Sequence, residues 1–447
     1  MKIDIFDIGR IYFSYDDIST IKRRNKSIDQ LFSSNYILGV LDFFLKFFYF
    51  LLRGNKRFPV KDRNKTRVIF YGYSRNNRLT LEPIIKEMGE ENVMSFVYQK
   101  TFPNWKLYWY ALPHLFELIR VIRNANKEQR VVLKMFFPKF WRLYGCPRVI
   151  NEMLDLYNPK VVVMANDHQE FNRCLMMMCK ERGIDTIYVQ HASAGTQFPP
   201  LQFSYSLLDG KDAFNKYKAI GSLEGNIYLM GGVRFDVIKS SYYKKPEKFV
   251  IGVAINVVDN PEKVKQTCKA LLNLKVNDGN PIVLLRPHPM MQEKEWISWC
   301  ENNGVAFSSP QKETSFEFIG KSSLIIANQS SIHLDTAMCH KQSIIYNMSN
   351  RPAEDIYLYK KNGLAKEVLN FEEIQSFINN LSSEDRGVES VQYFNCSYEC
   401  PYEGNVSKMI THLINGIIEN NVQHFNEEFG FKSVEENIDC KVYKFLS

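Results

Sequence analysis

The sequence predicts an α/β fold with two domains, each built on a mostly parallel sheet. The first observation is an alternation of apolar strands and helical segments, which runs through residues 66–238 and starts again at residue 249. Strands that alternate with helices are typical of βαβ units. The second observation is that several strands end in polar residues, as at the ligand-binding edge of open parallel sheets. The third is a polar, basic stretch, residues 239–248, which indicates an interdomain linker.

Composition favours a globular protein with an anionic partner. The chain has 447 residues, 45% hydrophobic and 24% charged, which suffices for two or three domains. Its net charge of +8 suits nucleotide phosphates or anionic lipid headgroups. No dense Lys/Arg tract with interleaved aromatic residues occurs, so nucleic acid is not an expected partner.

Cysteine usage and the N-terminus indicate the cytoplasm. The nine cysteines are scattered, with no CxxC pair and no zinc-type Cys/His spacing, so a reducing compartment and no metal site are expected. The first residues, MKIDIFDIGR, lack the basic-then-apolar pattern of an export signal.

Residues 1–65 form an expected N-terminal apolar and basic helical segment. Its most apolar run, residues 36–52, is followed by a basic flank at residues 53–63. Asp42 and Lys46 lie inside this run, where a charge at the centre of a bilayer costs about 3 kcal/mol. A helix on the inner face of the plasma membrane fits the pattern better than a membrane span. A Phe-rich packing helix buried in the protein fits it equally well.

The first domain is expected at residues 66–238, with a helical insertion near residues 102–145. That insertion is aromatic and basic, which fits a cover for an acceptor site, a membrane-facing element or ordinary helix packing. The other expected elements are strands at 67–74, 92–98, 161–164, 186–189 and 227–230 and helices at 81–88 and 170–182.

The second domain is expected at residues 249–420, and residues 421–447 are expected to be a peripheral polar tail. Its expected elements are strands beginning at 249 and spanning 282–285, 324–327 and 343–346, with helices from 261 and at 332–339, 370–381 and 406–420.

Two strand ends of the second domain carry the strongest functional signal. Residues 282–285 end in Arg286-Pro287-His288-Pro289, and residues 324–327 end in Asn328-Gln329-Ser330-Ser331. Hydroxyl groups at a helix start favour an anion, and Arg286 and His288 could supply a positive fork and a proton donor. The pattern predicts a phosphate site with an acid beside it. The structural alternative is that Ser330 only caps the helix and that Pro287 and Pro289 only end the strand.

Strand ends of the first domain carry candidate proton-transfer residues. Asp167 and His168 follow one strand, and Gln190 and His191 follow the next. The ordinary pKa of a histidine, near 6.5, suits His191 as a base, with Asp167 orienting it or acting as the base itself. His168 is expected to bind a ligand or to support the site. The structural alternatives are turn histidines that donate hydrogen bonds and an Asp167 that caps the helix beginning at Glu170.

These motifs resemble bacterial GT-B transferases that build surface polymers. RPHP followed by NQSSIHLD is similar to the "HP" and "SS" motifs of capsule sialyl- and Kdo-transferases, which use CMP-activated donors. It is also similar to the Arg-x-His and Ser-Ser-x-x-x-Asp motifs of teichoic-acid glycerophosphotransferases, which use CDP-glycerol. The Gln190-His191 turn resembles the Gln-His-Gly turn of capsule-synthesis transferases, although this chain has Ala192 in place of the glycine.

The resemblance implies two Rossmann-like domains that face a central cleft, and a role for each motif residue. His288 of the His288-Pro289 pair would contact or protonate the donor phosphate, and His191 or an acidic residue would be the base. The donor phosphate or nucleotide would be bound by Arg286, Pro289, Asn328, Ser330, Ser331 and Asp335. His168 and Gln190 would lie on the acceptor side. Leu208-Asp209-Gly210 matches the acidic sialyltransferase motif only in part.

The function implied is transfer of a sugar or polyol phosphate from a CMP- or CDP-linked donor to a growing surface polysaccharide. Such a capsule or cell-envelope glycosyltransferase would be cytoplasmic and membrane-associated, with a glycan or lipid-linked glycan as acceptor. It would need no cofactor and no metal. Two alternatives remain: a UDP-sugar 2-epimerase-like enzyme, and a non-catalytic polysaccharide-assembly protein with the same fold.

Overall fold

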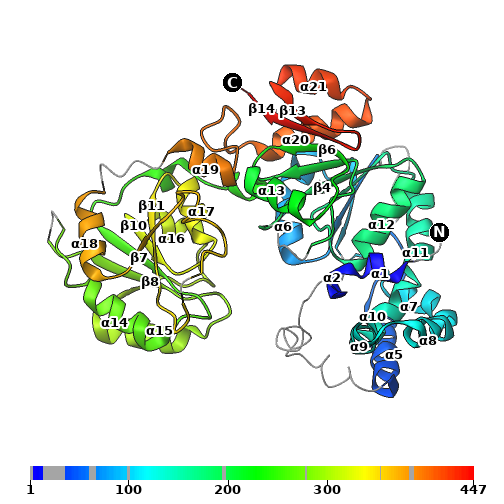
Figure 1. Cartoon of the computed structure of the whole chain (residues 1–447), viewed down its shortest axis with the longest axis horizontal. Helices are drawn as coiled ribbons and strands as arrows, with labels where there is room; N and C mark the ends of the chain where they lie inside the picture. Colours follow the sequence, from blue (N-terminus) through cyan, green and yellow to red (C-terminus); the bar gives the residue numbers. More distant parts are fainter. Residues whose placement is uncertain are drawn as a thin grey trace. The chain divides into compact units, whose positions relative to one another are not determined.

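The chain folds into two compact units (Figure 1). Unit 1 comprises residues 1–234 and 405–447, and unit 2 comprises residues 235–404. This computed structural model describes residues 4–13, 36–59, 67–97, 101–193, 198–276, 279–352, 354–381 and 387–446.

Unit 1 is built on an eight-stranded sheet with the order β13-β14-β6-β5-β4-β3-β1-β2. Its pairs are parallel except for the β13–β14 hairpin. The central strand β3 consists mainly of valine and is fully buried, a pattern typical of a sheet covered on both faces. The strands are β1 (Val68–Gly72), β2 (Val93–Val97), β3 (Val161–Met164), β4 (Asp185–Val189), β5 (Tyr205–Leu208), β6 (Gly225–Leu229), β13 (Phe431–Glu436) and β14 (Cys440–Phe445).

Helices connect these strands, and the expected insertion is mainly helical, with four helical elements between residues 105 and 135 and a fifth at 137–143. The helical elements of unit 1 are α1 (Ile5–Ile8), α2 (Arg10–Phe13), α5 (Tyr36–Arg53), α6 (Arg75–Met88), α7 (Trp105–Ala111), η1 (Leu112–His114), α8 (Leu115–Asn124), α9 (Lys127–Met135), α10 (Phe137–Leu143), α11 (Cys146–Tyr157), α12 (Glu170–Glu181), α13 (Lys211–Ile220), α20 (Val406–Ile418) and α21 (Val422–Glu428). The short helix η2 (Val233–Phe235) leads out of unit 1.

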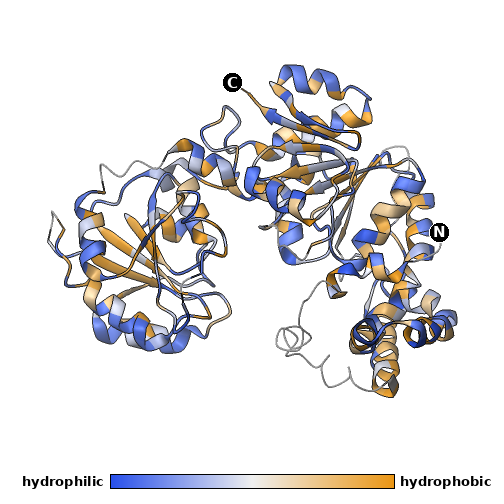
Figure 2. Ribbon diagram, viewed as in Figure 1, coloured by the Kyte–Doolittle hydropathy of each residue, from blue (hydrophilic) through white to orange (hydrophobic). Residues whose placement is uncertain are grey.

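Unit 2 is built on a six-stranded parallel sheet with the order β12-β11-β10-β7-β8-β9. The strands are β7 (Val250–Ala254), β8 (Ile282–Arg286), β9 (Ala306–Phe307), β10 (Leu324–Ala327), β11 (Gln342–Tyr346) and β12 (Lys366–Val368). The helices are η3 (Ser240–Tyr243), α14 (Pro261–Leu271), α15 (Glu293–Asn303), α16 (Ser315–Gly320), α17 (Ile332–Met338), α18 (Phe371–Asn379) and α19 (Val388–Phe394). Figure 2 shows the strands of this sheet in hydrophobic colours.

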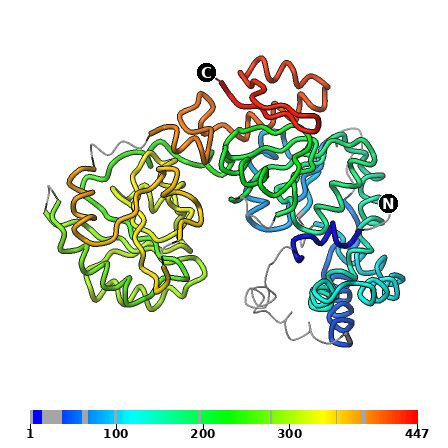
Figure 3. The backbone as a smooth tube through the Cα atoms, viewed as in Figure 1, coloured from blue at the N-terminus to red at the C-terminus, as the bar shows by residue number. Residues whose placement is uncertain are grey.

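The predicted fold class is confirmed, because the chain forms two α/β units on mainly parallel sheets. The cleft expected between them stays a prediction. The expected end of the second domain is wrong, since residues 405–447 return to unit 1. Helix α20 packs on α6 and β3 through a fully buried face, and β14 extends the sheet beside β6 (Figure 3). The tail reads as polar because edge strand β13 exposes its residues after Phe431.

The described parts of residues 1–65 belong to unit 1, so the expectation of a separate N-terminal segment there is wrong. Helix α5 packs against α7 and α10 and belongs to unit 1. Phe43 is fully buried and its ring stacks on Trp141 with 3.8 Å between ring centroids. Lys61 and Arg63 of the basic flank lie outside the described residues. Among the residues described, no helix is long and apolar enough to cross a membrane.

Candidate functional site

The two motif strands of unit 2 are separated in the sheet by one strand. Strand β7 lies between β8 and β10, so the segments after all three strands share one edge. The Ile255 amide, just past β7, donates to the Arg286 carbonyl at 3.0 Å. The Asn256 side chain donates to the Gln329 carbonyl at 3.3 Å. The end of β7 therefore joins the two motifs that the sequence places far apart.

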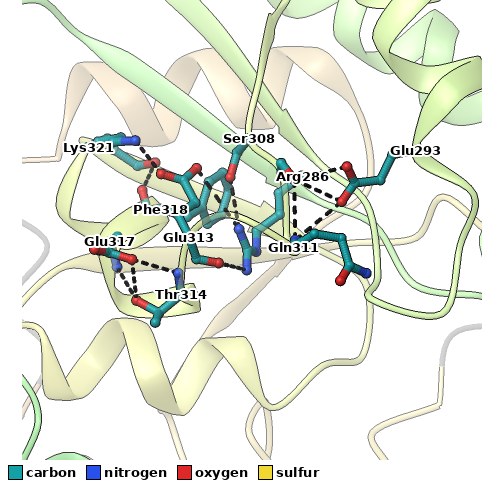
Figure 4. A network of polar contacts seen from close by, with 11 residues as sticks. Arg286, Glu293, Ser308, Gln311, Glu313, Thr314, Glu317, Phe318 and Lys321 are labelled. Carbon is teal, nitrogen blue, oxygen red and sulfur yellow. Dashed lines mark hydrogen bonds and ion pairs between the residues drawn. The ribbon is translucent and has the colours of Figure 1, made fainter.

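Arg286 is held by the protein itself (Figure 4). Its guanidinium donates to the Ser308 hydroxyl at 2.9 Å and to the Glu313 carbonyl at 2.9 Å. It also lies 4.0 Å from the Glu313 carboxylate and 5.7 Å from the Phe318 ring centroid. Only 8% of the residue is exposed. The Arg286 guanidinium was expected to be free to bind a phosphate. It instead links the end of β8 to residues 308–318.

His288 lies half-buried just past β8 with one ring nitrogen occupied. The Met290 amide donates to its Nδ1 at 3.2 Å. A nitrogen that accepts carries no proton, so the neutral ring bears its proton on Nε2. His288 can therefore donate a hydrogen bond through Nε2 without being charged. Pro289, next in the chain, is exposed.

A network of side-chain amides follows β10. Asn328 donates to the Asp259 carboxylate at 2.8 Å, and its own amide oxygen accepts from the Gln329 backbone at 2.8 Å. His333, fully buried, contacts the Asn328 carbonyl at 3.0 Å through Nε2. Within the described part of the chain, the Gln329 Oε1 atom is buried without a hydrogen-bond partner. These contacts fix the loop and leave Gln329 as a polar side chain without a protein partner for its oxygen.

Neither serine makes a short capping bond to helix α17, as the structural alternative would require of Ser330. Ser331 is the N-cap of α17, but its side chain makes no capping bond and the residue is exposed. The Ser330 hydroxyl accepts only a long contact, 3.4 Å, from the Ile332 amide. Asp335 lies one turn into α17 and is 7% exposed, so it is buried and does not face solvent at the sheet edge.

In unit 1 the ends of adjacent strands β3, β4 and β5 converge. Asp167, whose side chain is buried, accepts from the Tyr217 hydroxyl at 2.5 Å and from His168 Nδ1 at 2.9 Å. The Tyr188 hydroxyl lies 3.1 Å from that of Tyr217. Burial and the nearby carboxylate raise the pKa of Tyr217, so this phenol stays protonated. Asp167 therefore orients His168, whereas the sequence suggested His191.

Asn166 sets the proton position on His168 and removes the capping alternative for Asp167. The Asn166 oxygen accepts from the amides of His168 at 3.1 Å and Gln169 at 2.8 Å. Its NH₂ group therefore faces His168 Nε2, 3.4 Å away. This arrangement makes Nε2 the acceptor and Nδ1–H the donor to Asp167. The N-cap of α12 is Gln169, without a side-chain cap bond.

Gln190 is held by hydrogen bonds at both ends of its side-chain amide, whereas His191 has a ring nitrogen that accepts or donates none in the described ranges. Gln190 bridges two strand ends, accepting from the Asp209 amide at 2.8 Å and donating to the Ala192 carbonyl at 2.9 Å. His191 is half-buried, and its Nδ1 has no hydrogen-bond partner in the described ranges. Burial lowers the pKa of His191 to about 4. The expectation of an ordinary histidine pKa here is therefore wrong, because the ring is desolvated.

Two residues that sequence reasoning left out of the site lie at these edges. Asp209, 7% exposed, follows β5, and burial raises its pKa to about 7, against a smaller opposite effect of Arg234. Asn256 follows β7 in unit 2. Each follows a strand of the structure, β5 or β7, and a polar residue after an apolar run is the signal that could have identified them. Among the described residues, no group of three or more His, Cys, Asp or Glu side chains is placed to hold a metal.

Comparisons with known proteins give remote structural similarity only. No protein-family model matches the chain, and no curated protein sequence does either. A UDP-GlcNAc 2-epimerase from Neisseria meningitidis bound to UDP-GlcNAc is 13% identical, with a TM-score of 0.47 over 78% of this chain and 99% of that one. S. aureus MnaA with UDP is 11% identical, with a TM-score of 0.46 over 80% of this chain and 98% of that one. The wall teichoic acid polymerase TagF is 12% identical, with a TM-score of 0.42 over 89% of this chain and 100% of that one. Similarity at this level assigns neither a family nor an activity.

Proposed function

We propose that this protein is a glycosyltransferase-type enzyme that transfers a sugar or polyol phosphate from a nucleotide-activated donor to a surface glycan. A CMP- or CDP-linked donor is favoured by the motif resemblance. The observation that carries the proposal is the strand order of unit 2, which brings the segments at 286–289 and 328–331 to one sheet edge. Carboxyl ends of parallel strands are where such sheets bind nucleotides.

Unit 2 would bind the donor phosphate with neutral hydrogen-bond donors. His288 Nε2–H and the hydroxyl groups of Ser330 and Ser331 are the proposed contacts, with Asn328 and Gln329 shaping the loop. Hydrogen bonds to a charged group are each worth about 1.5–3 kcal/mol. Arg286 and Asp335 act as positioning residues in this proposal, because Arg286 is bound by protein atoms and Asp335 is buried on α17.

Unit 1 would supply the base that takes the proton of the acceptor hydroxyl. As the new bond to the donor forms, the bond to the nucleotide phosphate breaks, and His288 stabilises the leaving phosphate. The candidates for the base are His191, the His168–Asp167 pair and Asp209. The proposal uses no metal or cofactor, since His288 and the hydroxyl groups take the role of stabilising the phosphate.

Calorimetry with CMP, CDP and UDP tests the donor site. We expect a cytidine nucleotide to bind best, and His288→Ala and Ser330→Ala to weaken binding by about 10-fold or more. His424→Ala and Ser298→Ala are matched controls, because these residues are exposed and lie on α21 and α15. Binding that neither site variant changes would overturn the proposal.

Two further outcomes would identify the alternatives. A uridine preference together with isomerisation of a UDP-sugar in the absence of an acceptor would indicate a 2-epimerase-like enzyme. Tight nucleotide binding without turnover on any acceptor, and no functional loss with His288→Ala, would indicate a non-catalytic assembly protein.

The pH dependence of kcat/KM identifies the base. Asp209, with a pKa of about 7, accepts a proton only when ionised, so an Asp209-dependent rate would fall about tenfold per pH unit below pH 7. His191, with a pKa of about 4, is already neutral at pH 6, so a His191-dependent rate would stay flat there. The Asp209→Asn and His191→Gln variants show which limb each group controls.

A further inference from the structure

Helix α5 of unit 1 presents a row of exposed apolar side chains. The row recurs at every third or fourth residue along the helix, as expected for one face. Figure 2 shows the helix mostly in hydrophobic colours. The members and their exposed fractions are Ile37 69%, Leu41 49%, Leu45 63%, Phe48 51%, Tyr49 54% and Leu52 78%.

The opposite face of α5 holds the helix in place. Phe43, Phe47 and Phe50 are between 0% and 9% exposed. They follow Leu41, Leu45 and Phe48 by two residues, which at about 100° per residue turns them to the far side of the helix. The exposed row is therefore additional to the core contacts. A monomeric soluble protein has little reason to keep a continuous apolar surface of this kind in water.

Exposed aromatic residues typical of a membrane interface occur on α5 and on α7, which packs against it. Trp109 on α7 is 52% exposed, and its ring lies parallel to that of Phe47 at 6.3 Å between centroids. Tyr49 belongs to the row itself. Indole and phenol groups combine an apolar body with a polar tip, which places them at the level of lipid headgroups.

Exposed basic residues follow the row. Arg53, Lys56 and Arg57 are exposed, and the Arg53 guanidinium lies 6.0 Å from the Tyr49 ring centroid. The Trp105 indole donates to the Lys56 carbonyl at 3.2 Å, which fixes this stretch against α7. Asp42, the acidic residue within the helix, is paired with Lys46 at 2.8 Å. The row is thus bordered by positive charge.

We propose that the outer face of α5, with Trp109 and the basic stretch at residues 53–57, binds the surface of a membrane that contains anionic lipids. The helix would lie in the plane of the interface, with Leu41, Leu45 and Leu52 among the acyl chains. An apolar face beside arginine and lysine matches such a surface in both polarity and charge. The helix does not cross the membrane, because its inner face is already buried against α7 and α10.

Flotation of the full chain with lipid vesicles tests this proposal. We expect binding to vesicles with about one-third phosphatidylglycerol and weaker binding to pure phosphatidylcholine. The Leu41→Ser/Leu45→Ser variant should reduce the bound fraction at least about tenfold. The Arg53→Gln/Arg57→Gln variant should lose the preference for anionic vesicles, and added salt should reproduce that loss.

The control exchanges two exposed apolar residues of unit 2, Ile356→Ser/Leu369→Ser, which are 65% and 74% exposed. The Leu41→Ser/Leu45→Ser and Ile356→Ser/Leu369→Ser variants should both keep the wild-type melting temperature, because each replaces exposed side chains. The proposal is overturned if the wild type does not float with anionic vesicles, or if the α5 variant floats equally well. It is also overturned if sedimentation shows that the row joins two copies of the chain and that neither form binds lipid. Nucleotide calorimetry on the same variants reports separately on the donor site.

Discussion

The strand-end edges of the two units differ in the chemistry they display. In unit 1 the edge gathers titratable side chains: Asp167, His168, His191 and Asp209, with phenols behind them. In unit 2 the edge gathers side-chain amides and hydroxyl groups after β7 and β10, with His288 after β8. The charged groups there, Asp259 and Arg286, are bound by protein atoms. Both edges come from the same α/β construction, so the difference lies in the residues placed after equivalent strands.

Under the proposed function, the edge of unit 1 transfers protons and the edge of unit 2 binds the anion. Groups with shifted pKa values are suited to moving protons, and such groups cluster at catalytic sites. Neutral hydrogen-bond donors can bind a phosphate without a positively charged side chain for each of its negative charges. Variants that act on one edge and leave the other unchanged test this contrast.

The largest expected effect concerns the stability of unit 1 and its dependence on pH. The pKa of Asp209 is raised from 3.8 to about 7 in the folded chain, so folding retains a proton that the unfolded chain releases. The stability that this group contributes is present below pH 3.8 and is lost as pH rises to about 7. At 1.36 kcal/mol per pKa unit, the loss amounts to up to about 4 kcal/mol.

Asp209→Asn should remove that loss. We expect the variant to gain stability over the wild type between pH 5 and pH 8 in chemical denaturation. Asp155→Asn is the control, since Asp155 is an exposed surface residue paired with Arg182. An equal pH response of the wild type and Asp209→Asn would show that the carboxyl titrates normally and that the edge is not tuned.

A smaller effect is expected on turnover from Asp167→Asn. Removing the carboxylate charge releases the Nδ1–H of His168 and the hydroxyl of Tyr217, so the proton-transfer geometry is lost. We expect kcat to fall about 100-fold, within the range for general acid–base catalysis, while nucleotide affinity in unit 2 stays unchanged. Equal losses of nucleotide affinity and kcat would contradict the division between the two edges.

The smallest effect separates a binding serine from a capping residue in unit 2. Thr314 caps α16 through a reciprocal pair of bonds with Glu317, so Thr314→Ala should cost about 1 kcal/mol of stability. Ser331 makes no capping bond, so Ser331→Ala should leave stability within about 0.5 kcal/mol while weakening nucleotide binding. Destabilisation of both variants to the same extent would mean that Ser331 has a structural role.

Much of the architecture was predictable because strands and helices have different local periodicities. The apolar runs at 161–164, 282–285 and 324–327 are strands in the structure, and the polar residues after them lie at sheet edges. What local pattern could not predict was pairing between distant segments. Residues 440–445 look like a polar tail, and their hydrogen-bonding partner β6 lies about half the chain away.

The fold class and the positions of polar groups after strands were predictable from local pattern, since both depend on nearest neighbours along the chain. Which of those groups meet, and in what protonation state, depends on tertiary packing. Arg286 is bound by Ser308 and Glu313, Asp167 by His168 and Tyr217, and Asp209 is buried. Likewise, only packing showed that α5 has one buried face and one exposed apolar face. The physical reason is that desolvation and hydrogen bonding depend on surroundings supplied by distant parts of the chain.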